Sequence, residues 1–443
     1  MALSAASAGS TASASKSVAI VGGGWAGLAC ALKLAQAGYQ PIVFESAPEP
    51  GGRARRAQVE GRHRDNGQHL MLAGGDSLNT LFASAGITLP TTAFSFQSDA
   101  RQLCVPPNAG SLGLAFALLR AKGFSWQERY RLIVSLLRLQ ANGWRVPKDQ
   151  TVAHWLQQTK QPAGLIQAFW APLTLAILNT PLAEAAMRRL APTLRDTLGK
   201  DGRALGILQP QGNLTECIVS PLVKAIEEAG GTVRCGARIT AINQADIGYA
   251  LLVGNETNTL QFDQVVLALP PWSLSKMALP DSLPTAALAQ SFGDQPIATV
   301  YLGFATDFHL PAPLLQIAGP TPGDARVWAI DRGHCGEPGV IAVSLSAQGP
   351  WCDLSGDELA QACLLALQNA FDEAPTCLWK KAVIVQRATY ASTPEAFIPH
   401  QDLEPLPHLH LAGDWTHPEY PATLEAAVYS GFSTAHRIMQ QQT

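Results

Sequence analysis

The sequence lacks the cysteine patterns that mark metal sites and disulfide-stapled secreted proteins. Its eight cysteines include no CxxC pair and no cysteine–histidine spacing typical of metal ligands. They are scattered through the chain, at positions 30, 104, 217, 235, 335, 352, 363 and 377. We therefore expect no metal, and we interpret the cysteines as reduced thiols of a cytoplasmic protein.

Charge is scarce as well. Only 15% of the 443 residues are charged, and the formal net charge is −3, which argues against nucleic acid as a main partner. Hydrophobic residues make up 47% of the sequence. A chain of this length and composition can bury a sizeable core and form two domains.

No stretch suggests a signal peptide or a membrane anchor. Residues 1–16 are mostly alanine and serine and lack a basic start followed by an apolar core, so we expect a disordered tail. The most apolar stretch, Ala163 to Leu178, is interrupted by polar residues and a proline and is short for a bilayer span. We find no internal repeat and no long linker.

The first positive signal is a glycine-rich turn near the N-terminus. The pattern predicts a strand from Ser17 to Val21 and, after the turn, a helix rich in alanine and leucine. The glycines of the turn are Gly22, Gly24 and Gly27. In this spacing the first glycine permits a tight turn, the second permits close approach to a pyrophosphate, and the third permits close helix–strand packing. The segment therefore predicts a dinucleotide site at the positive end of a helix dipole.

Further residues favour a cofactor longer than NAD. Glu45 follows a second apolar run, where a carboxylate would accept hydrogen bonds from ribose hydroxyls. A second glycine turn comes next and is followed by an arginine, whose guanidinium can bind a phosphate. A third turn precedes a closing helix near the C-terminus. These segments are Gly51, Gly52 and Arg53, then Gly413 and Asp414, with the helix beginning near Thr423 and Leu424. We expect FAD, approached from both ends of the chain.

Together these segments resemble the superfamily of FAD-binding amine oxidases and phytoene desaturases. Three further stretches resemble the squalene-associated FAD-dependent desaturases, the hydroxysqualene dehydroxylase family of bacterial hopanoid pathways. They are Asp65 to His69, then Trp170 to Leu173 with Leu178 to Pro181, and Ala412 to Thr416 with Pro421 to Thr423. The resemblance covers nearly all of the chain after residue 16.

The resemblance implies an α/β fold with interleaved domains. We expect a Rossmann-like FAD-binding domain from residues 17–95, 200–275 and 405–443. Residues 96–199 and 276–404 would form an α+β substrate domain that carries a helical cap. Within it, Ile297 to Phe304, Arg326 to Asp331 and Gly339 to Ala347 predict strands of a second sheet, and Ser355 to Glu358 predict a capping box at the start of a helix.

The resemblance also implies reductive dehydroxylation of hydroxysqualene to squalene, with FAD carrying the redox chemistry. Two alternatives remain within flavoenzymes, a carotenoid-type polyene desaturase and an amine oxidase. A third alternative is a prenyl-lipid escort protein without redox chemistry. The intact glycine turns argue against the escort protein, but the residues themselves do not separate dehydroxylation from desaturation. No nicotinamide motif indicates the electron donor.

The resemblance extends to individual site residues. Asp65 and His69 can titrate near the flavin and are candidate proton donors, although both also fit an ordinary turn and a hydrogen bond to the backbone or flavin. Trp170, Asn179, Trp415 and Tyr420 are candidates for the substrate pocket, with packed core as the alternative. The expected cofactor contacts are Gly22, Gly24, Trp25, Ala26, Gly27, Glu45, Gly51, Gly52, Arg53, Gly67, Gln68, His69, Gly413, Asp414, Thr423 and Leu424, with Arg238 and Ile239 at the adenine.

Residues 101–150 carry the clearest signal for a partner. They contain eight lysines and arginines but only two acidic residues, interspersed with leucines and aromatic residues. Basic charge beside apolar and aromatic side chains is typical of helices that lie on a membrane surface. A cap hairpin with a solvated basic face fits the periodicity equally well. We expect peripheral contact with an anionic membrane on its cytoplasmic face.

Overall fold

Strand β1 (Ser17–Val21) occupies the centre of a five-stranded sheet because its side chains are apolar on both faces. In the computed structural model it pairs in parallel with β2 (Gln40–Phe44) and β14 (Gln264–Leu267). Strands β10 (Thr232–Arg234) and β20 (Leu409–Leu411) form the edges, also in parallel. The sheet therefore unites segments from both ends of the sequence.

The structure describes residues 17–98, 101–107, 109–146, 150–199, 206–254, 259–280, 283, 288, 290–396 and 406–441. The tail expected for residues 1–16 lies outside them.

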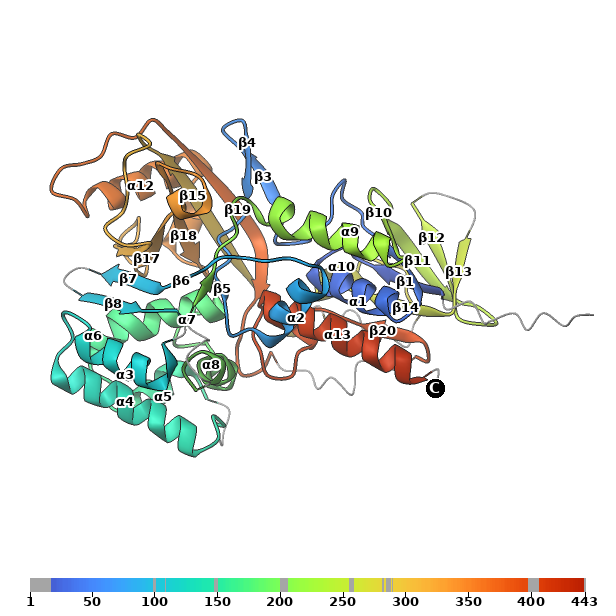
Figure 1. Cartoon of the computed structure of the whole chain (residues 1–443), viewed down its shortest axis with the longest axis horizontal. Coiled ribbons are helices and arrows are strands. Elements are labelled where there is room, and N and C mark those ends of the chain that lie inside the picture. The colour runs from blue at the N-terminus through green and yellow to red at the C-terminus, as the bar shows by residue number, and fades with distance from the viewer. Residues whose placement is uncertain are drawn as a thin grey trace, which may run out of the picture.

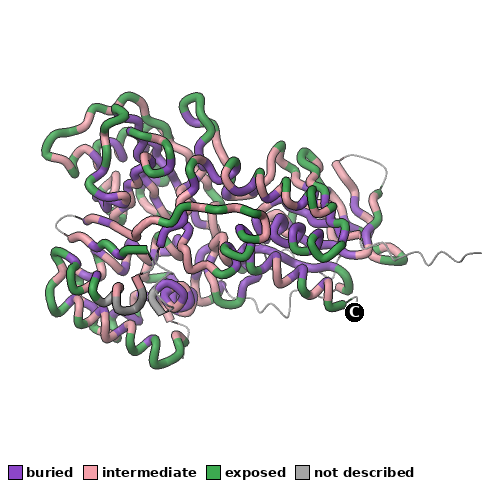
Figure 2. Tube along the Cα trace, viewed as in Figure 1, coloured by how far each residue is buried: buried purple, intermediate pink, exposed green. Residues whose placement is uncertain are grey.

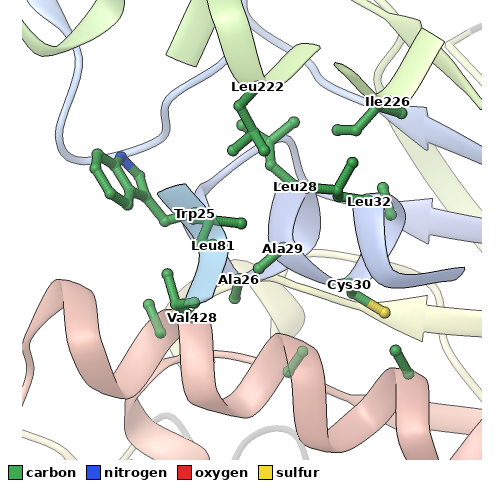
Figure 3. Close-up of a cluster of buried hydrophobic side chains, with 14 of the residues drawn as sticks. Trp25, Ala26, Leu28, Ala29, Cys30, Leu32, Leu81, Leu222, Ile226 and Val428 are labelled. Atoms are coloured by element: carbon green, nitrogen blue, oxygen red, sulfur yellow. The ribbon is translucent and has the colours of Figure 1, made fainter. Parts of the chain in front are cut away.

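Alternate residues of β1 face two different layers. Val18 and Ile20 pack against α1 (Trp25–Gln36), which lies between α9 (Ser220–Glu228) and α13 (Leu424–Gln441). Figure 3 shows this arrangement, with Leu222 and Ile226 on one side of α1 and Val428 on the other. Ala19 and Val21 face the opposite layer, a small antiparallel sheet. Its strands are β11 (Ile239–Gln244), β12 (Tyr249–Val253) and β13 (Thr259–Phe262).

A seven-stranded sheet forms the second body of the molecule, separated along the long axis from the first sheet (Figure 1). Its neighbouring strands are antiparallel except for β16 and β7. In spatial order they are β19 (Trp379–Tyr390), β15 (Asp294–Gly303), β18 (Val340–Ser346), β17 (Val327–Asp331), β16 (Leu314–Ile317), β7 (Phe94–Ser98) and β8 (Arg101–Val105). The three strands predicted for a second sheet are thus confirmed.

Helix α12 (Gly356–Gln368) covers one face of this sheet. It begins with the predicted capping box, in which Ser355 and Glu358 exchange side-chain and backbone hydrogen bonds. Such a box satisfies two backbone N–H groups that a helix start otherwise leaves unpaired. The capping-box sequence alone therefore predicted the start of this helix correctly.

The helical cap has a hydrophobic core of its own around Leu132, Trp155, Trp170 and Leu190. Its long helices α3 (Gly110–Arg120) and α4 (Trp126–Ala141) pack together through Arg129, whose guanidinium donates to the carbonyls of Leu118, Leu119, Ala121 and Phe124. The other helices are α5 (Val152–Gln158), α6 (Ala163–Leu165), η1 (Ile166–Trp170), α7 (Ala171–Leu178), α8 (Met187–Leu194) and η2 (Arg195–Gly199). None of the helices in the described ranges has the length and apolarity to span a bilayer.

Short elements connect these bodies. They are the hairpin β3 (Arg56–Val59) and β4 (Arg62–Asp65), the small sheet of β5 (Met71–Leu72), β9 (Ile207–Leu208) and β6 (Thr91–Thr92), and helices α2 (Asp76–Ser84), η4 (Thr215–Val219), α10 (Pro271–Leu274), η5 (Arg332–Cys335), η6 (Pro350–Asp353) and η8 (Asp414–Thr416). Figure 2 shows buried residues gathered in the five-stranded sheet and its helices. The α/β fold is as expected, whereas the exact domain boundaries stay a prediction.

Candidate functional site

The first glycine turn connects β1 to α1, and two of its glycines are required by the protein itself. Gly22 has φ +112°, and a Cβ there would overlap the carbonyl oxygen of Ala268. A Cβ on Gly27 would overlap the carbonyl oxygen of Gly22. Helix α1 begins after Gly24 without a side-chain cap. Its first N–H groups thus lack the side-chain acceptor that often occupies such a position, which suits an anionic ligand.

The second glycine turn lies directly against the first. Gly51 N–H donates to the carbonyl of Gly23 at 2.8 Å. A Cβ on Gly52 would lie only 3.0 Å from the Cα of Gly24. The two turns, although separated in the sequence, therefore form one backbone cradle that side chains would fill.

Glu45 stands at the end of β2 beside this cradle. One carboxylate oxygen accepts from the backbone N–H of Gly23 at 2.8 Å and the other from that of Ala47 at 2.7 Å. These bonds fix the carboxylate beside the cradle, and its hydrogen bond to a ribose stays a prediction. The backbone N–H of Ala237 donates to the carbonyl of Glu45 at 2.8 Å, which brings the start of β11 alongside.

Arg238 and Ile239 follow directly after that contact. Arg238 is exposed, whereas the Ile239 side chain is buried in the core between the two sheets. Only the backbone of Ile239 and the Arg238 side chain thus remain available to an adenine. Their adenine contact stays a prediction.

The C-terminal turn meets the second glycine turn through an ion pair. Asp414, buried after β20, accepts from the Arg53 guanidinium at 2.6 Å, and Arg53 also donates to the carbonyl of Ala388 at 3.0 Å. Gly413 has φ +153° and donates its N–H to the Ser430 hydroxyl at 2.9 Å. The expected convergence of both chain ends is therefore present. The role of Arg53 toward a phosphate stays a prediction, because two of its nitrogens already bind protein oxygens.

The start of α13 completes this side of the site. Thr423 accepts from the backbone N–H of Ala426 at 3.2 Å, so its hydroxyl caps the helix. Leu424 packs against the core of the first sheet. Glu425, which the sequence did not single out, accepts from the backbone N–H groups of Ser77 and Leu78 at 2.8 and 3.0 Å. Its carboxylate joins α13 to the N-terminus of α2, where negative charge is stabilised.

Asp65 is buried at the end of β4. Its carboxylate accepts from the backbone N–H of Leu214 at 2.7 Å and lies 3.7 Å from the Arg332 guanidinium. Burial raises the pKa of Asp65 to about 6, against the opposing effects of Arg332 and the Leu214 N–H. A carboxyl group with this pKa is partly protonated near neutral pH, as a general acid must be.

Gln68 lies in a network that reaches the seven-stranded sheet. Its side-chain N–H donates to the hydroxyl of Tyr301 at 2.9 Å, and its oxygen accepts from Arg332 at 3.2 Å. Tyr301 in turn donates to the carbonyl of Asp65 at 2.7 Å. One N–H and the oxygen of the Gln68 amide are thus engaged by side chains of β15 and η5, and the expected contact of Gln68 with a cofactor stays a prediction.

Three buried polar atoms near the glycine turns have no hydrogen-bond partner among the described residues: Trp25 Nε1, Asn66 Oδ1 and His69 Nε2. Leaving such an atom unpaired costs about 1–3 kcal/mol, so they favour a polar ligand. His69 Nε2 lies 3.6 Å from the position of a Cβ on Gly67. Burial and the nearby Arg53 charge lower the pKa of His69 to about 4. The imidazole is thus neutral at neutral pH and suits a hydrogen bond better than acid catalysis.

The rest of the Trp25 side chain packs in the core, 6.5 Å from the ring of Phe82 between centroids. Ala26 is buried where α1 meets α13, since a Cβ on Gly431 would overlap its carbonyl oxygen. Contact of Trp25 and Ala26 with a cofactor is therefore restricted to backbone groups of the first helical turn and the Trp25 ring nitrogen.

The predicted substrate pocket needs correction. Trp170 is 0% exposed inside the cap core, and Trp415 is 2% exposed beneath the five-stranded sheet. A side chain that lines a cavity exposes surface to it, so these two tryptophans belong to separate packed cores. Tyr420 is half-buried, with its ring 4.8 Å from that of His417 between centroids. Its place in a pocket stays a prediction.

Asn179 is also structural. Its side-chain oxygen accepts from the backbone N–H of Ala347 at 2.5 Å, and its side-chain nitrogen donates to the Thr389 hydroxyl at 2.9 Å and the Pro296 carbonyl at 3.3 Å. It also ends α7 in the left-handed conformation, with φ +46°. This single side chain joins the helical cap to three strands of the large sheet or their ends.

We expect Asn179→Ala to destabilise the protein by about 2–4 kcal/mol. The substitution leaves buried polar groups without hydrogen-bond partners and places alanine in the left-handed region. Thermal unfolding followed by circular dichroism measures the loss. Asn142→Ala is the matched control, since Asn142 ends α4 at an exposed position with negative φ. Equal losses of stability from the two substitutions would contradict the role of Asn179 in joining the cap to the large sheet.

Taken together, the glycine cradle, the fixed Glu45 carboxylate, the uncapped start of α1 and the unpartnered polar atoms fit a nucleotide-containing cofactor. In the described ranges, no group of three histidine, cysteine, aspartate or glutamate side chains is arranged to hold a metal ion.

Comparison with known proteins agrees with this chemistry. The family described as flavin containing amine oxidoreductase matches residues 25–439. A hydroxysqualene dehydroxylase of Rhodopseudomonas palustris is 29% identical over 96% of this chain and 99% of its own length, and one of Zymomonas mobilis is 27% identical over 94% and 97%. A 15-cis-phytoene desaturase of Glycine max is 24% identical over 96% of this chain and 79% of its own length.

Solved structures show the same fold. Putrescine oxidase bound to putrescine is 16% identical, with a TM-score of 0.70 over 96% of this chain and 99% of that one. A putative protoporphyrinogen oxidase from Exiguobacterium gives a TM-score of 0.69 at 17% identity, over 97% and 99%. At these identities the likeness concerns the mixed α/β architecture alone.

Proposed function

Since the chain belongs to the family of flavin containing amine oxidoreductases, we propose that it is an FAD-dependent hydroxysqualene dehydroxylase. Membership in this family makes the protein a flavin oxidoreductase. The proposal concerns its substrate and the identity of the flavin as FAD. The observation that carries it is the near end-to-end similarity to two hydroxysqualene dehydroxylases.

In the proposed reaction the C–O bond of an allylic alcohol breaks, a proton converts the departing hydroxyl to water, and a hydride takes its place on carbon. Bound reduced FAD would supply the hydride. The chain supplies the cradle of Gly24 and Gly52, the Glu45 carboxylate for the ribose and the neutral His69 for a polar edge of the cofactor. Asp65, with its raised pKa, is the candidate that delivers the proton.

A second function has specific support. Several 15-cis-phytoene desaturases match 96% of the chain, at 23–26% identity. Desaturation would run the hydride in the opposite sense, from substrate to oxidised flavin. The redox state that the protein needs at the start of the reaction therefore separates the two functions.

The decisive experiment uses the purified flavin-loaded protein, photoreduced without oxygen and mixed with hydroxysqualene in detergent micelles. We expect squalene in the lipid extract and stoichiometric oxidation of the flavin. The same protein in its oxidised form is mixed with phytoene in parallel. Desaturated product there, with no squalene in the first reaction, would replace dehydroxylation by desaturation.

The proposal includes a hydrophobic isoprenoid substrate and work at the cytoplasmic face of a membrane. A triterpene has almost no aqueous concentration, so an enzyme that acts on it gains from contact with the bilayer that dissolves it.

A further inference from the structure

The outer surface of α3 and α4 combines exposed apolar side chains with basic charge, and we infer that it docks on the surface of a bilayer that contains anionic phospholipid. We call it the α3–α4 face and define it by Phe116, Leu119, Arg120, Trp126, Tyr130, Leu137 and Arg138. This inference deepens the proposed function by assigning its membrane contact to one surface, and it rests on the proposed function only for its biological purpose.

Helix α4 is apolar on two opposite faces. Leu132 and Leu139 are buried in the core of the cap. Tyr130 and Leu137, about two helical turns apart on the other side, are 62% and 56% exposed, and Trp126 at the helix start is 74% exposed. A helix of a globular protein normally keeps its outward face polar. The outward face of α4 therefore has the composition of a contact surface.

Exposed apolar side chains are concentrated here. Of the ten large hydrophobic side chains that are exposed in the described part of the chain, five lie on α3 and α4, including Phe116 and Leu119 on α3. Single exposed apolar residues need no explanation, but a cluster marks an interaction site. Figure 1 places α4 along the outer edge of the cap, and Figure 2 shows exposed residues along that edge.

The charge of the α3–α4 face has one sign. Glu128 is the only acidic residue between positions 101 and 146, and its carboxylate is turned inward, bound to Arg101 and to the backbone N–H of Ser125. Arg120 and Arg138 are exposed. The guanidinium of Arg120 lies 4.4 Å from the ring centre of Phe116, so cation and aromatic ring share one location. Such pairs suit the headgroup region, where rings enter and cations meet phosphate.

A second copy of the chain fits this surface less well than a bilayer does. In a two-fold dimer the same patch meets itself, so Arg120 and Arg138 of one copy would face cations of the other without compensating carboxylates. An anionic headgroup layer provides negative charge over the whole face. We therefore commit to the bilayer.

The test is flotation of the flavin-loaded protein with vesicles of phosphatidylcholine alone or mixed with phosphatidylglycerol. We expect stronger binding to the anionic vesicles, weakened by salt because surface charges are screened over about 10 Å at 0.1 M ionic strength. The double substitution Arg120→Gln with Arg138→Gln should weaken anionic binding by on the order of twentyfold, since each cation near such a surface contributes about fivefold. Arg129 is left intact because it joins α3 to α4.

The apolar part is tested by Trp126→Ser with Leu137→Ser, which should weaken binding at least about tenfold at equal charge. The matched control is Ile247→Ser with Leu378→Ser, two exposed apolar residues outside the face that should leave binding unchanged. The difference in fluorescence between the wild type and a Trp126→Phe variant reports on Trp126. Brominated lipid should quench this part of the fluorescence. Equal flotation of wild type and both α3–α4 variants, or concentration-dependent dimerisation abolished by Trp126→Ser, would overturn the inference.

These measurements need no substrate, and the dehydroxylation assay in micelles needs no bilayer. Vesicle binding without squalene formation would leave the inference standing and reject the proposed function. Squalene formation in micelles by a protein that does not float with vesicles would support the proposed function and reject the inference.

Discussion

A protein with Gly24→Val should fold normally and purify without flavin. The backbone at Gly24 is extended, with φ −76° and ψ 176°, which any residue adopts. A Cβ added there would meet only the Cα of Gly52, at an ordinary 3.9 Å. The new side chain would instead project into the cradle where a pyrophosphate approaches the backbone. An overlap worth about 3 kcal/mol lowers affinity roughly a hundredfold.

Flavin absorbance of the purified protein measures this effect, with circular dichroism to confirm folding. Gly27→Ala provides the contrast, because its methyl group would overlap the Gly22 carbonyl and destabilise the fold itself. Gly38→Asn is the neutral control, since Gly38 has φ +82° with open space around it. A yellow Gly24→Val protein would show that the cofactor does not lie on this cradle.

The second large effect is expected at Asp65. If Asp65 delivers the proton, Asp65→Asn should slow the oxidation of reduced flavin by hydroxysqualene by roughly a hundredfold or more. The wild-type rate should fall as the pH rises through about 6, because the donor must be protonated and its pKa is raised to about 6. The variant should lose that pH dependence. Rapid single-turnover measurements in detergent from about pH 5 to about pH 8 report both the rate and its pH dependence.

Asp357→Asn, an exposed carboxylate in the first turn of α12, serves as the control and should leave rate and pH profile unchanged. An Asp65→Asn enzyme with the wild-type rate would assign Asp65 a purely structural role as acceptor for the Leu214 N–H. His69 does not replace it as an imidazolium donor, because the lowered pKa keeps the ring neutral in this pH range.

Local patterns predicted much of the fold because their causes are local. The apolar run of β1, the glycine spacing before α1 and the capping box of α12 each act within a few residues. The strands of the second sheet were likewise visible in their apolar runs. The glycine turns also predicted that both ends of the chain meet at the cofactor, but not the ion pair of Arg53 with Asp414, which are 361 positions apart.

The substrate pocket and the polar network could not be predicted in this way. Whether Trp170 lines a cavity or fills a core depends on Trp155 and Phe169, which surround it only after the cap has folded. Tyr301 meets Asp65 across 236 positions, and neither segment carries a motif for the other. Glu425 binds the start of α2 across 348 positions. Such partners are chosen by tertiary packing, which a single sequence does not display.

The place of β20 in the first sheet also fixes the order of events during synthesis. The strand, Asp414 and α13 all come from residues 409–441, and they supply the edge of the sheet, the partner of Arg53 and the helix that covers α1. A ribosome-bound chain without these residues has its first glycine turn but lacks the edge strand, the partner of Arg53 and the helix that packs on α1. Flavin capture therefore has to wait until residues 409–441 have been synthesised and have folded onto the sheet, and a truncation that removes α13 should leave a protein that cannot retain the cofactor.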